Sequence, residues 1–492
     1  MLKKIIYAKI YTEKEGAYTV KKICHFFRDH NGNLYCYDTN SNSVFEIDEL
    51  MKSIIDGKDK KHLLKLWSPT EIDNAFDEFE SLQERGFFAD GNLHKEISTT
   101  YDFSNVNLLS ASLMVSSDCN MRCIYCFNDG GTKPEDSSEI MSFDVAKSAI
   151  DYLVKNSNRE EIGCDFFGGE PLYNYKLIKR IVEYCQNHTS KKWIFSLITN
   201  GTIINDEIIE MFKNNCFHVV VSYDSVLQNK QRPSQCGKDL VPTIRENIKK
   251  LRNILPRSEI SIRCILTHEM CAHIGEVIEE AKELGVRVLF GPVTLEESNP
   301  LNLTDEDYAL YIDIIENVLS KNYNDKNFDL VTGITSLSSI ILQLITGRKK
   351  YFSCGVGTDQ VGVSATGKIY PCHRFIGIRE LEMGDIYSGI KKDIYEKYTS
   401  RYVDNMHPCS ECWAKYLCGG GCAHEAYTYN NDLFSPHIKR CELTKNEIEI
   451  ALKIYASAIK NGEHTQLEKI AQIIGNNPIA NTRIHNSHEI VL

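Results

Sequence analysis

The sequence predicts an α/β protein with a parallel sheet of six strands, preceded by a small winged-helix-like α+β domain and followed by a cysteine-rich domain. Three observations support this prediction. Apolar strands alternate with amphipathic helices between about residues 108 and 293, aromatic and polar residues alternate near the N-terminus, and ten of the 18 cysteines fall into two clusters. At 492 residues the chain is long enough for two or three domains.

The charge and hydropathy of the chain exclude several classes of protein. The formal net charge of −11 argues against a general nucleic-acid binder, because such proteins normally carry a basic surface. No run of about 18 apolar residues occurs, and charges interrupt the opening MLKKIIYAKIYTEKEG too early for a signal peptide. We therefore expect a cytoplasmic protein that binds neither nucleic acid nor a membrane.

Residues 1–95 are expected to form the winged-helix-like domain. Aromatic and polar residues alternate in CHFFRDHNGNLYCYDTNSNSVFEID, which predicts strands joined by hairpins. A helix should begin at Pro69 with Ser68 as its cap and end before Gly86. A DNA-binding role is disfavoured, because residues 1–96 hold 14 Lys and Arg against 17 Asp and Glu.

Residues 105–325 are expected to hold the parallel sheet. Each predicted strand is separated from the next by a helix with one apolar face. This alternation gives right-handed crossovers in either an open sheet or a partial barrel, with the active edge at the carboxyl ends of the strands. The predicted strands are 108–117, 162–167, 193–199, 218–224, 260–266 and 286–293.

Residues 345–450 are the predicted cysteine-rich domain, and residues 451–492 the C-terminal helix and tail. Periodicity is lost beyond residue 350, so bound metal is expected to organise this region. The C-terminal helix is predicted over 465–475, before a loosely held tail. Eight isolated cysteines are expected to be mostly small buried hydrophobic residues, with Cys236 in an exposed loop; they are Cys24, Cys36, Cys164, Cys185, Cys216, Cys236, Cys264 and Cys271.

Three cysteines directly after the first strand form the most informative motif. CNMRCIYCF places Cys119, Cys123 and Cys126 among polar neighbours. A zinc site would need a fourth ligand from elsewhere, whereas a [4Fe-4S] cubane would bind three thiolates and leave its fourth iron open. The motif resembles the signature of the radical S-adenosylmethionine (SAM) enzymes, in which the open iron binds the amino and carboxylate groups of SAM.

This resemblance implies a partial (βα)6 TIM-like barrel and a set of SAM contacts. FFGGEPL is similar to the family's turn at the SAM amino group, and LITNGT and VSYDS are similar to its later strand ends, with Ser222 and Asp224 facing outward. Arg232 resembles the arginine that pairs with the SAM carboxylate, although SVLQNKQ replaces the usual Gly and His before it. Thr199 and Arg263 are equally open to a structural role. The implied SAM contacts are Phe127, Gly168, Gly169, Glu170, Ser222 and Arg232.

Seven cysteines in the C-terminal region resemble the SPASM domain, an extension of radical SAM enzymes that holds two auxiliary iron-sulfur clusters. CSECWAKYLCGGGC alone is also compatible with a zinc ribbon. The resemblance leaves one cluster a ligand short, so its fourth ligand comes from another loop or from a substrate thiolate. It assigns Cys409, Cys412, Cys418 and Cys441 to an outer cluster and Cys354, Cys372 and Cys422 to an inner one.

The resemblance also implies the reaction and its partners. Residues 1–95 resemble the precursor-peptide recognition element of radical SAM/SPASM peptide maturases, where a strand edge binds a leader peptide. We expect an oxidoreductase of sactipeptide type, which links a Cys sulfur of a ribosomally made peptide to an α-carbon by a thioether. It would use SAM, three [4Fe-4S] clusters and an external electron donor such as flavodoxin or ferredoxin. No general base is identified.

Two other functions remain open at this point. The same fold could cross-link peptide carbons or oxidise a Cys or Ser, as in anaerobic sulfatase maturation. The N-terminal domain argues against sulfatase maturation, because that group generally lacks a leader-binding domain. An iron-sulfur or zinc-containing winged-helix regulator is a third interpretation, and the acidic N-terminal domain and the SAM-site motifs argue against it.

Overall fold

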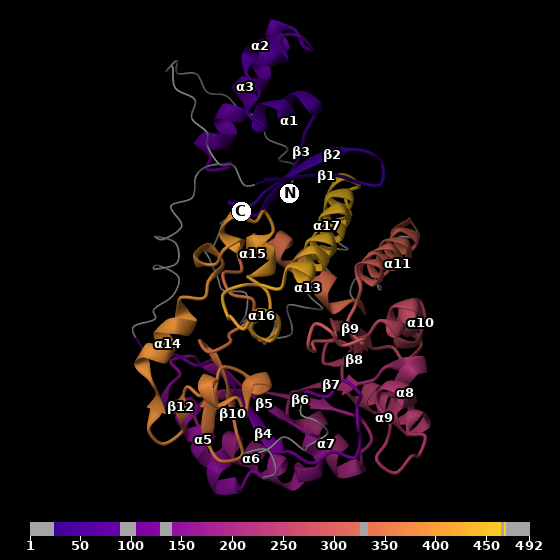
Figure 1. Cartoon of the computed structure of the whole chain (residues 1–492), viewed down its shortest axis with the longest axis vertical. Helices are drawn as coiled ribbons and strands as arrows, with labels where there is room; N and C mark the ends of the chain where they lie inside the picture. Colours follow the sequence, from indigo (N-terminus) through magenta and orange to yellow (C-terminus); the bar gives the residue numbers. More distant parts are fainter. Residues whose placement is uncertain (1–23, 89–104, 128–139, 325–332, 464–466, 469–492) are drawn as a thin grey trace.

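The computed structural model describes residues 24–88, 105–127, 140–324, 333–463 and 467–468 (Figure 1). The helix predicted over 465–475 and the tail lie almost entirely outside these residues. Within the described ranges, no helix is long and apolar enough to cross a membrane.

Six parallel strands form the centre of the molecule, as the sequence predicts. Each strand pairs with the next one along the chain, in the order β4-β5-β6-β7-β8-β9. In the described part of the chain β4 and β9 are not paired with each other, which is consistent with a partial barrel. The strands are β4 (Ser110–Ser116), β5 (Glu161–Gly168), β6 (Lys192–Thr199), β7 (Phe217–Ser222), β8 (Ile260–Leu266) and β9 (Arg287–Pro292).

Helices follow these strands where amphipathic segments were predicted. In β8 the residues Ile262, Cys264 and Leu266 are fully buried in the main core, whereas Arg263 points to the opposite face. This alternation places one set of side chains against the helices and the other toward the interior of the curved sheet. The helices are α5 (Phe143–Lys155), α6 (Tyr175–His188), α7 (Asp206–Asn214), α8 (Gln228–Gln231), α9 (Val241–Ile254) and α10 (Ile274–Glu283).

The cysteine-rich region extends the central sheet, which the sequence did not predict. The strand β10 (Gln360–Val363) pairs in parallel with β4, and three short antiparallel strands continue from it. These are β11 (Lys368–Tyr370), β12 (Gly384–Asp385) and β13 (Gly389–Ile390), so the complete sheet has ten strands. The cysteine-rich region is therefore fixed to the first barrel strand by backbone hydrogen bonds.

The N-terminal region folds into a three-stranded antiparallel sheet followed by three helices (Figure 1). The longest helix begins at Pro69 with the predicted cap, because the Ser68 side chain accepts a hydrogen bond from the backbone N–H of Glu71. All five residues of β2 are buried. The elements are β1 (Cys24–Arg28), β2 (Leu34–Asp38), β3 (Ser43–Glu46), α1 (Glu49–Ile55), α2 (Lys60–Leu63) and α3 (Pro69–Glu84).

This small sheet has two covered faces. Cys36 and Phe45 pack with the helices α1 to α3, whereas Phe27, Tyr35 and Tyr37 belong to the main core of the molecule. The two aromatic faces explain why the sequence alternates yet β2 is buried along its whole length.

The C-terminal part is helical around the cysteines. Two helices follow the barrel, α11 (Asp305–Asn324), where TDEDYALYIDIIENVLSKN is helical in its sequence pattern, and α13 (Thr335–Thr346), which was not predicted. The boundary expected near residue 450 falls inside α17 (Ile438–Lys460), which packs against α13. The shorter helices are α14 (Lys392–Thr399), α15 (Lys415–Cys418) and α16 (Ala423–Asn430).

The isolated cysteines mostly behave as predicted. Cys36, Cys164, Cys185, Cys264 and Cys271 are buried, and Cys236 is exposed. Cys216 is also exposed, contrary to the expectation, since its apolar sequence neighbours do not enclose it.

Candidate active site and cysteine clusters

The CNMRCIYC loop lies at the carboxyl end of β4 and is held by the loop that follows β7. Backbone hydrogen bonds run from Arg122 N–H to Pro233 O at 2.8 Å, from Ile124 N–H to Gln231 O at 2.9 Å, and from Gln235 N–H to Asn120 O at 2.8 Å. The loop conformation therefore depends on two segments more than 100 residues apart, and it forms from backbone contacts within the protein.

The charges of the three thiols in this loop interact with one another. Burial raises the pKa of Cys123 to about 11, Arg232 opposes the rise, and the thiols of Cys126 and Cys119 add to it. Cys119 Sγ accepts hydrogen bonds from Met121 N–H at 3.4 Å and from Asn200 Nδ2 at 3.7 Å. Half-buried thiols whose charges interact suit a positive metal centre, which would bind them as thiolates.

Asp224 organises the other side of the site and corrects one expectation. It is fully buried, not outward-facing, because it accepts hydrogen bonds from Tyr125 OH, from Arg232 Nε at 2.9 Å and from Ile265 N–H at 3.0 Å. The same arginine directs Nη1 toward Cys123 Sγ at 4.0 Å. Asp224 thus fixes the guanidinium group of Arg232 beside the cysteine loop.

The Gly-Gly turn after β5 is required by close backbone packing. A Cβ atom at Gly168 would lie 2.0 Å from Ser116 O, and one at Gly169 would lie 2.3 Å from Ser117 O. Any side chain here would push the ends of β4 and β5 apart. These glycines therefore place the start of the cysteine loop against the β5 turn.

Glu170 is buried and already has protein partners. Its carboxylate accepts hydrogen bonds from Thr199 Oγ1 at 2.7 Å, from Asn200 N–H at 2.7 Å and from Leu172 N–H at 3.1 Å. Burial raises the pKa of Glu170 to about 7, although these donors lower it. The structure gives Glu170 and Thr199 a role in joining the ends of β5 and β6, and contact of Glu170 with SAM stays a prediction.

Aromatic rings connect the cysteine loop with the C-terminal region. Phe127 stacks on Phe167 with a centroid separation of 5.8 Å, and His373 lies 4.3 Å from Phe167 on a tilted ring. The Arg374 guanidinium lies 5.7 Å from the Phe127 centroid. Ser222 ends β7 and is paired with Arg263 of β8. Phe127 and Ser222 thus lie at the predicted edge of the sheet.

The charges of the seven C-terminal cysteines interact in two sets, and their assignment to an inner and an outer cluster stays a prediction. Burial raises the pKa of Cys372 to about 12, and the thiols of Cys354 and Cys422 contribute. Burial likewise raises the pKa of Cys441 to about 12, with contributions from Cys418, Cys409 and Cys412. All 18 cysteines lie in described residues, and the other cysteines lie in other elements, so the inner group keeps three thiols.

Arg401 provides a test of whether these groups suit iron-sulfur clusters. It is only 2% exposed, and it donates hydrogen bonds to the backbone oxygens of Leu433 at 2.6 Å and Gly420 at 3.3 Å. No carboxylate of the described residues lies within ion-pairing distance of it. The thiols of Cys354, Cys422, Cys409 and Cys418 act most strongly on its charge, and the Asp432 carboxylate also acts on it without forming an ion pair. Ionised thiols, such as metal-bound thiolates, would stabilise a buried cation between the two groups.

No set of three His, Cys, Asp or Glu side chains among the described residues converges on a single metal ion. A cubane does not require such convergence, because each thiolate binds a different iron atom. The residues present therefore fit clusters better than a mononuclear ion.

The N-terminal sheet contacts the outer cysteine group directly. Trp413 follows Cys412 in sequence, its ring stacks on His25 of β1 at 3.8 Å, and its carbonyl accepts a hydrogen bond from Thr39 Oγ1 at 2.7 Å. His25 also lies 2.9 Å from Glu449 of α17. The predicted recognition element thus rests on segments that carry outer-group cysteines.

Three residues of this region were missed from the sequence. Asn200 links Cys119 to Asn120, and His373 and Arg374 reach from the cysteine-rich region to the barrel edge. The sequence offers a signal for Asn200, which lies in the quoted LITNGT segment. For the other two no signal exists, because their contact crosses about 200 residues of chain.

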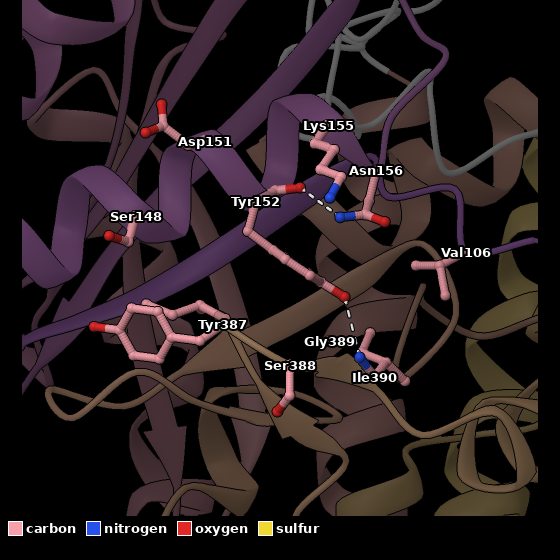
Figure 2. A pocket seen from close by; sticks show the side chains of 11 residues that line it. Val106, Ser148, Asp151, Tyr152, Lys155, Asn156, Tyr387, Ser388, Gly389 and Ile390 are labelled. Carbon is pink, nitrogen blue, oxygen red and sulfur yellow. Dashed lines mark hydrogen bonds between the residues drawn. The ribbon is translucent and has the colours of Figure 1, made fainter.

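A separate groove of about 530 Å³ lies between α5 and the β12–β13 hairpin, and Figure 2 shows its lining. The hydroxyl of Tyr152 accepts a hydrogen bond from Ile390 N–H at 3.2 Å there. None of the predicted site residues lines this groove.

The central region of the chain matches a known protein family, and longer stretches are similar to curated proteins. Residues 113–284 match the family model described as the Radical SAM superfamily. The chain is 25% identical over 370 residues to a cysteine-type anaerobic sulfatase-maturating enzyme of Clostridium perfringens, covering 70% of this chain and 92% of that one. It is 26% identical over 333 residues to the radical SAM cyclopropyl synthase TigE of Paramaledivibacter caminithermalis, covering 63% and 66% respectively.

Solved structures share the fold. The structure of anSMEcpe with bound AdoMet superposes with a TM-score of 0.62 at 21% identity, over 77% of this chain and all of that one. Streptococcus suis SuiB bound to S-adenosylmethionine gives a TM-score of 0.50 at 14% identity, over 85% of this chain and 98% of that one.

Proposed function

Because the chain carries a radical SAM domain and is related to anaerobic sulfatase-maturating enzymes, we propose that it is a peptide maturase that forms Cys sulfur-to-α-carbon thioether bridges in a ribosomally made precursor. The observation that carries the proposal is the placement of an incomplete inner cysteine group next to the barrel edge. His373 follows Cys372 of that group, and its ring lies tilted against Phe167, which stacks on Phe127. A peptide held at this edge would face both sites.

A [4Fe-4S] cluster with bound SAM supplies reductive cleavage of SAM and removal of a hydrogen atom from carbon. The residues of this chain hold and orient that group. Cys119, Cys123 and Cys126 are its ligands in the proposal, and Asp224 orients Arg232 so that Nη1 can reach the SAM carboxylate. Phe127 and Phe167 exclude water from the reacting carbon.

Formation of the thioether requires one acceptor for a hydrogen atom and another for an electron. One C–H and one S–H bond break and one C–S bond forms, so the peptide loses two hydrogens. One leaves as a hydrogen atom to the SAM-derived radical, and the other leaves as a proton and one electron. The inner group of Cys354, Cys372 and Cys422, one thiol short of four, suits a substrate thiolate as its remaining ligand. The auxiliary sites would accept the electron.

Residues 1–95 supply peptide recognition in this proposal. The sheet β1-β2-β3 has two edge strands, and an extended leader could add to one of them through main-chain hydrogen bonds. Relatives of the sulfatase-maturating type match 70% of this chain, so a substantial part of the chain lies beyond that match.

Mass spectrometry of a coexpressed peptide tests the function. Each small Cys-containing open reading frame beside the gene is expressed with the protein under anaerobic conditions, in full-length and leaderless forms. We expect loss of two hydrogens per bridge with loss of free thiols, in the full-length peptide only. Peptides that keep every thiol unmodified would contradict the thioether proposal.

Oxidation of a single Cys or Ser side chain is the second candidate, favoured by the relation to sulfatase-maturating enzymes. The same spectra separate the two functions, because oxidation changes one residue without joining two. Fragment ions that run through the modified Cys without a gap would support this second candidate.

A further inference from the structure

Asn200 directly follows β6 and begins a tight turn beside the cysteine loop. Its side-chain oxygen accepts hydrogen bonds from Thr202 N–H at 3.0 Å and from Thr202 Oγ1 at 2.7 Å. Gly201 has a φ of +73°, and a Cβ there would lie 2.7 Å from Val221 Cγ1, so the turn requires glycine. The segment NGT therefore forms an Asx turn that fixes the Asn200 side chain.

The contacts of this side chain determine which end of its amide faces the cysteines. A backbone N–H can only donate, so the atom that faces Thr202 N–H must be the oxygen, and the NH2 group points the other way. Its two hydrogens serve two acceptors, since Nδ2 lies 2.7 Å from Asn120 Oδ1 and 3.7 Å from Cys119 Sγ. Asn200 is only 6% exposed, so bulk water has little access to this contact.

Further contacts hold the backbone of the turn. The Asn200 N–H donates to Glu170 Oε2 at 2.7 Å, and the buried Asn247 of α9 donates from Nδ2 to Gly201 O at 2.8 Å. Asn120 Nδ2 closes the network by donating to Thr202 Oγ1 at 2.9 Å. The amide donor is thus positioned by the protein's own contacts, and its bond to sulfur costs little further side-chain entropy.

The three thiols of the loop differ in the hydrogen bonds they accept. Cys119 Sγ accepts one from Met121 N–H at 3.4 Å as well as one from Asn200. Cys123 Sγ has only the Arg232 guanidinium, at 4.0 Å. Cys126 Sγ accepts no hydrogen bond from the described residues. Two neutral N–H donors therefore converge on one of the three proposed ligands.

Hydrogen bonds to a ligand sulfur are one of the factors that set the reduction potential of an iron-sulfur cluster. The hydrogen of an N–H group carries partial positive charge, so it stabilises the reduced cluster, which has one more electron, better than the oxidised cluster. In a buried site this effect is stronger, because the local dielectric constant is low.

We propose that Asn200 is a positioning residue of the SAM-binding cluster, whose side-chain amide holds the Cys119 thiolate and raises the reduction potential of that cluster. A higher potential makes the cluster easier for the external electron donor to reduce. The inference rests on the proposed function in one respect, because it takes Cys119, Cys123 and Cys126 as the cluster ligands. It does not depend on which bond the enzyme forms in its substrate.

Pulsed electron paramagnetic resonance tests the hydrogen bond itself. The full-length protein is made with asparagine labelled with nitrogen-15 in the side-chain amide, reconstituted anaerobically and reduced. The SAM-binding cluster is identified as the one whose signal changes when SAM is added. We expect a nitrogen-15 coupling to this cluster in the wild type and its loss in N200S. A wild type without the coupling, or a coupling that survives in N200S, would overturn the proposal.

Anaerobic redox titration of the same signal measures the effect on the potential. N200S removes the amide donor without adding a charge, and its hydroxyl can still accept the Thr202 N–H. At a fixed potential we expect the ratio of reduced to oxidised cluster to fall about tenfold, the worth of one hydrogen bond to a charged group. This change corresponds to about 59 mV for one electron. N214S, the same substitution at the exposed end of α7, is the matched control and should leave the ratio unchanged.

A second variant covers the case in which N200S loses its iron. T202V keeps the amide but removes the hydroxyl that holds its oxygen, so it should give a smaller shift in the same direction. Formation of 5'-deoxyadenosine by the wild type reports the proposed function separately, and its absence would refute that function. Active wild type together with unchanged potentials in N200S and T202V would overturn the role of Asn200 alone.

Discussion

The two cysteine-bearing regions of this protein are held in place by different forces. The Cys119 loop follows β4 and is fixed by backbone hydrogen bonds to residues 231–235 and by the Asn200 amide. The outer group of Cys409, Cys412, Cys418 and Cys441 is spread over a 3-10 turn, α15 and the start of α17, and Cys412 and Cys418 pack against the main core. The first group lies in one loop that the barrel holds, whereas the second joins several short elements to a long helix.

The two regions therefore differ in what a bound metal is expected to contribute to the protein. In the barrel, the strand ends position the proposed cysteine ligands. In the C-terminal region, the buried Arg401 forms no ion pair with a carboxylate of the described residues and feels the charges of thiols from both groups, so we expect ionised thiols to stabilise it. Loss of metal should therefore cost activity in the first region and structure in the second.

Substitution of the barrel cysteines should give the largest effect. Replacing Cys119, Cys123 and Cys126 by Ala leaves the loop hydrogen bonds in place but removes every proposed ligand. We expect reductive cleavage of SAM, measured as 5'-deoxyadenosine, to fall at least about a thousandfold, the scale seen when a unit of essential catalytic groups is removed. The exposed Cys236→Ser variant is the control, and cleavage that survives in the triple variant would show that the site is misplaced.

Iron removal should affect the two regions unequally. The reconstituted protein is expected to hold about twelve irons, four for each of three cubanes. After chelation, hydrogen exchange should become fast over residues 402–445, because metal binding supplies their folding energy, and stay slow in β5 to β8. Equal hydrogen-exchange protection with and without iron would contradict the expected difference between the two regions. A content of about four irons would mean that the auxiliary clusters are absent.

Arg401 allows a smaller change within the C-terminal region. Removing its charge disfavours an added electron nearby, so R401Q should lower the reduction potentials of the auxiliary clusters. At a separation of about 6 Å and an effective dielectric constant of about 20, the expected shift is on the order of 100 mV. Anaerobic titration followed by electron paramagnetic resonance measures it.

R401K should restore most of that shift, and K392Q on the exposed start of α14 should leave the potentials unchanged. Potentials in R401Q that match the wild type would show that Arg401 does not act on the clusters.

Substitution of His218 should give the smallest effect, a change in how the stability of the barrel depends on pH. It lies in β7, 9% exposed, and burial lowers its pKa to about 4, with Asp165 opposing and Arg287 assisting that shift. In the unfolded chain His218 becomes protonated below about pH 6.5, whereas in the folded protein it stays neutral until about pH 4. Its contribution to stability is therefore complete above pH 6.5 and is lost as the pH falls, by about 2 kcal/mol at pH 5.

Hydrogen exchange in β6 to β8, measured between about pH 5 and 7.5, follows this loss in the barrel. H218Q should flatten the pH dependence over that interval. An unchanged slope in H218Q would mean that another group controls the acid stability of the barrel.

Much of the barrel could be predicted from local pattern. The six strands follow from apolar runs between helices, and the helix at Pro69 follows from the capping residue Ser68. The two C-terminal cysteine groups were assigned from spacing, and thiols within each group influence one another's charge in the structure. In each case the signal lies within a few residues, so no long-range contact is needed to read it.

Other features needed contacts that sequence spacing does not reveal. Asp224 was expected to face outward, but it is buried because Arg232, Tyr125 and the Ile265 backbone converge on it. The strand β10 and the helix α17 were missed, since the first needs β4 as a partner and the second crosses an expected domain boundary.

The sequence by itself determined the kinds of ligand, their grouping and the alternation of strands and helices, because these depend on neighbours along the chain. Only the tertiary structure decided that Asp224 is buried against Arg232, and that Arg401 is buried where thiols of the inner and outer groups act on its charge. Charges interact through space, so which of them are paired, and which are left for a ligand, depends on the folded arrangement.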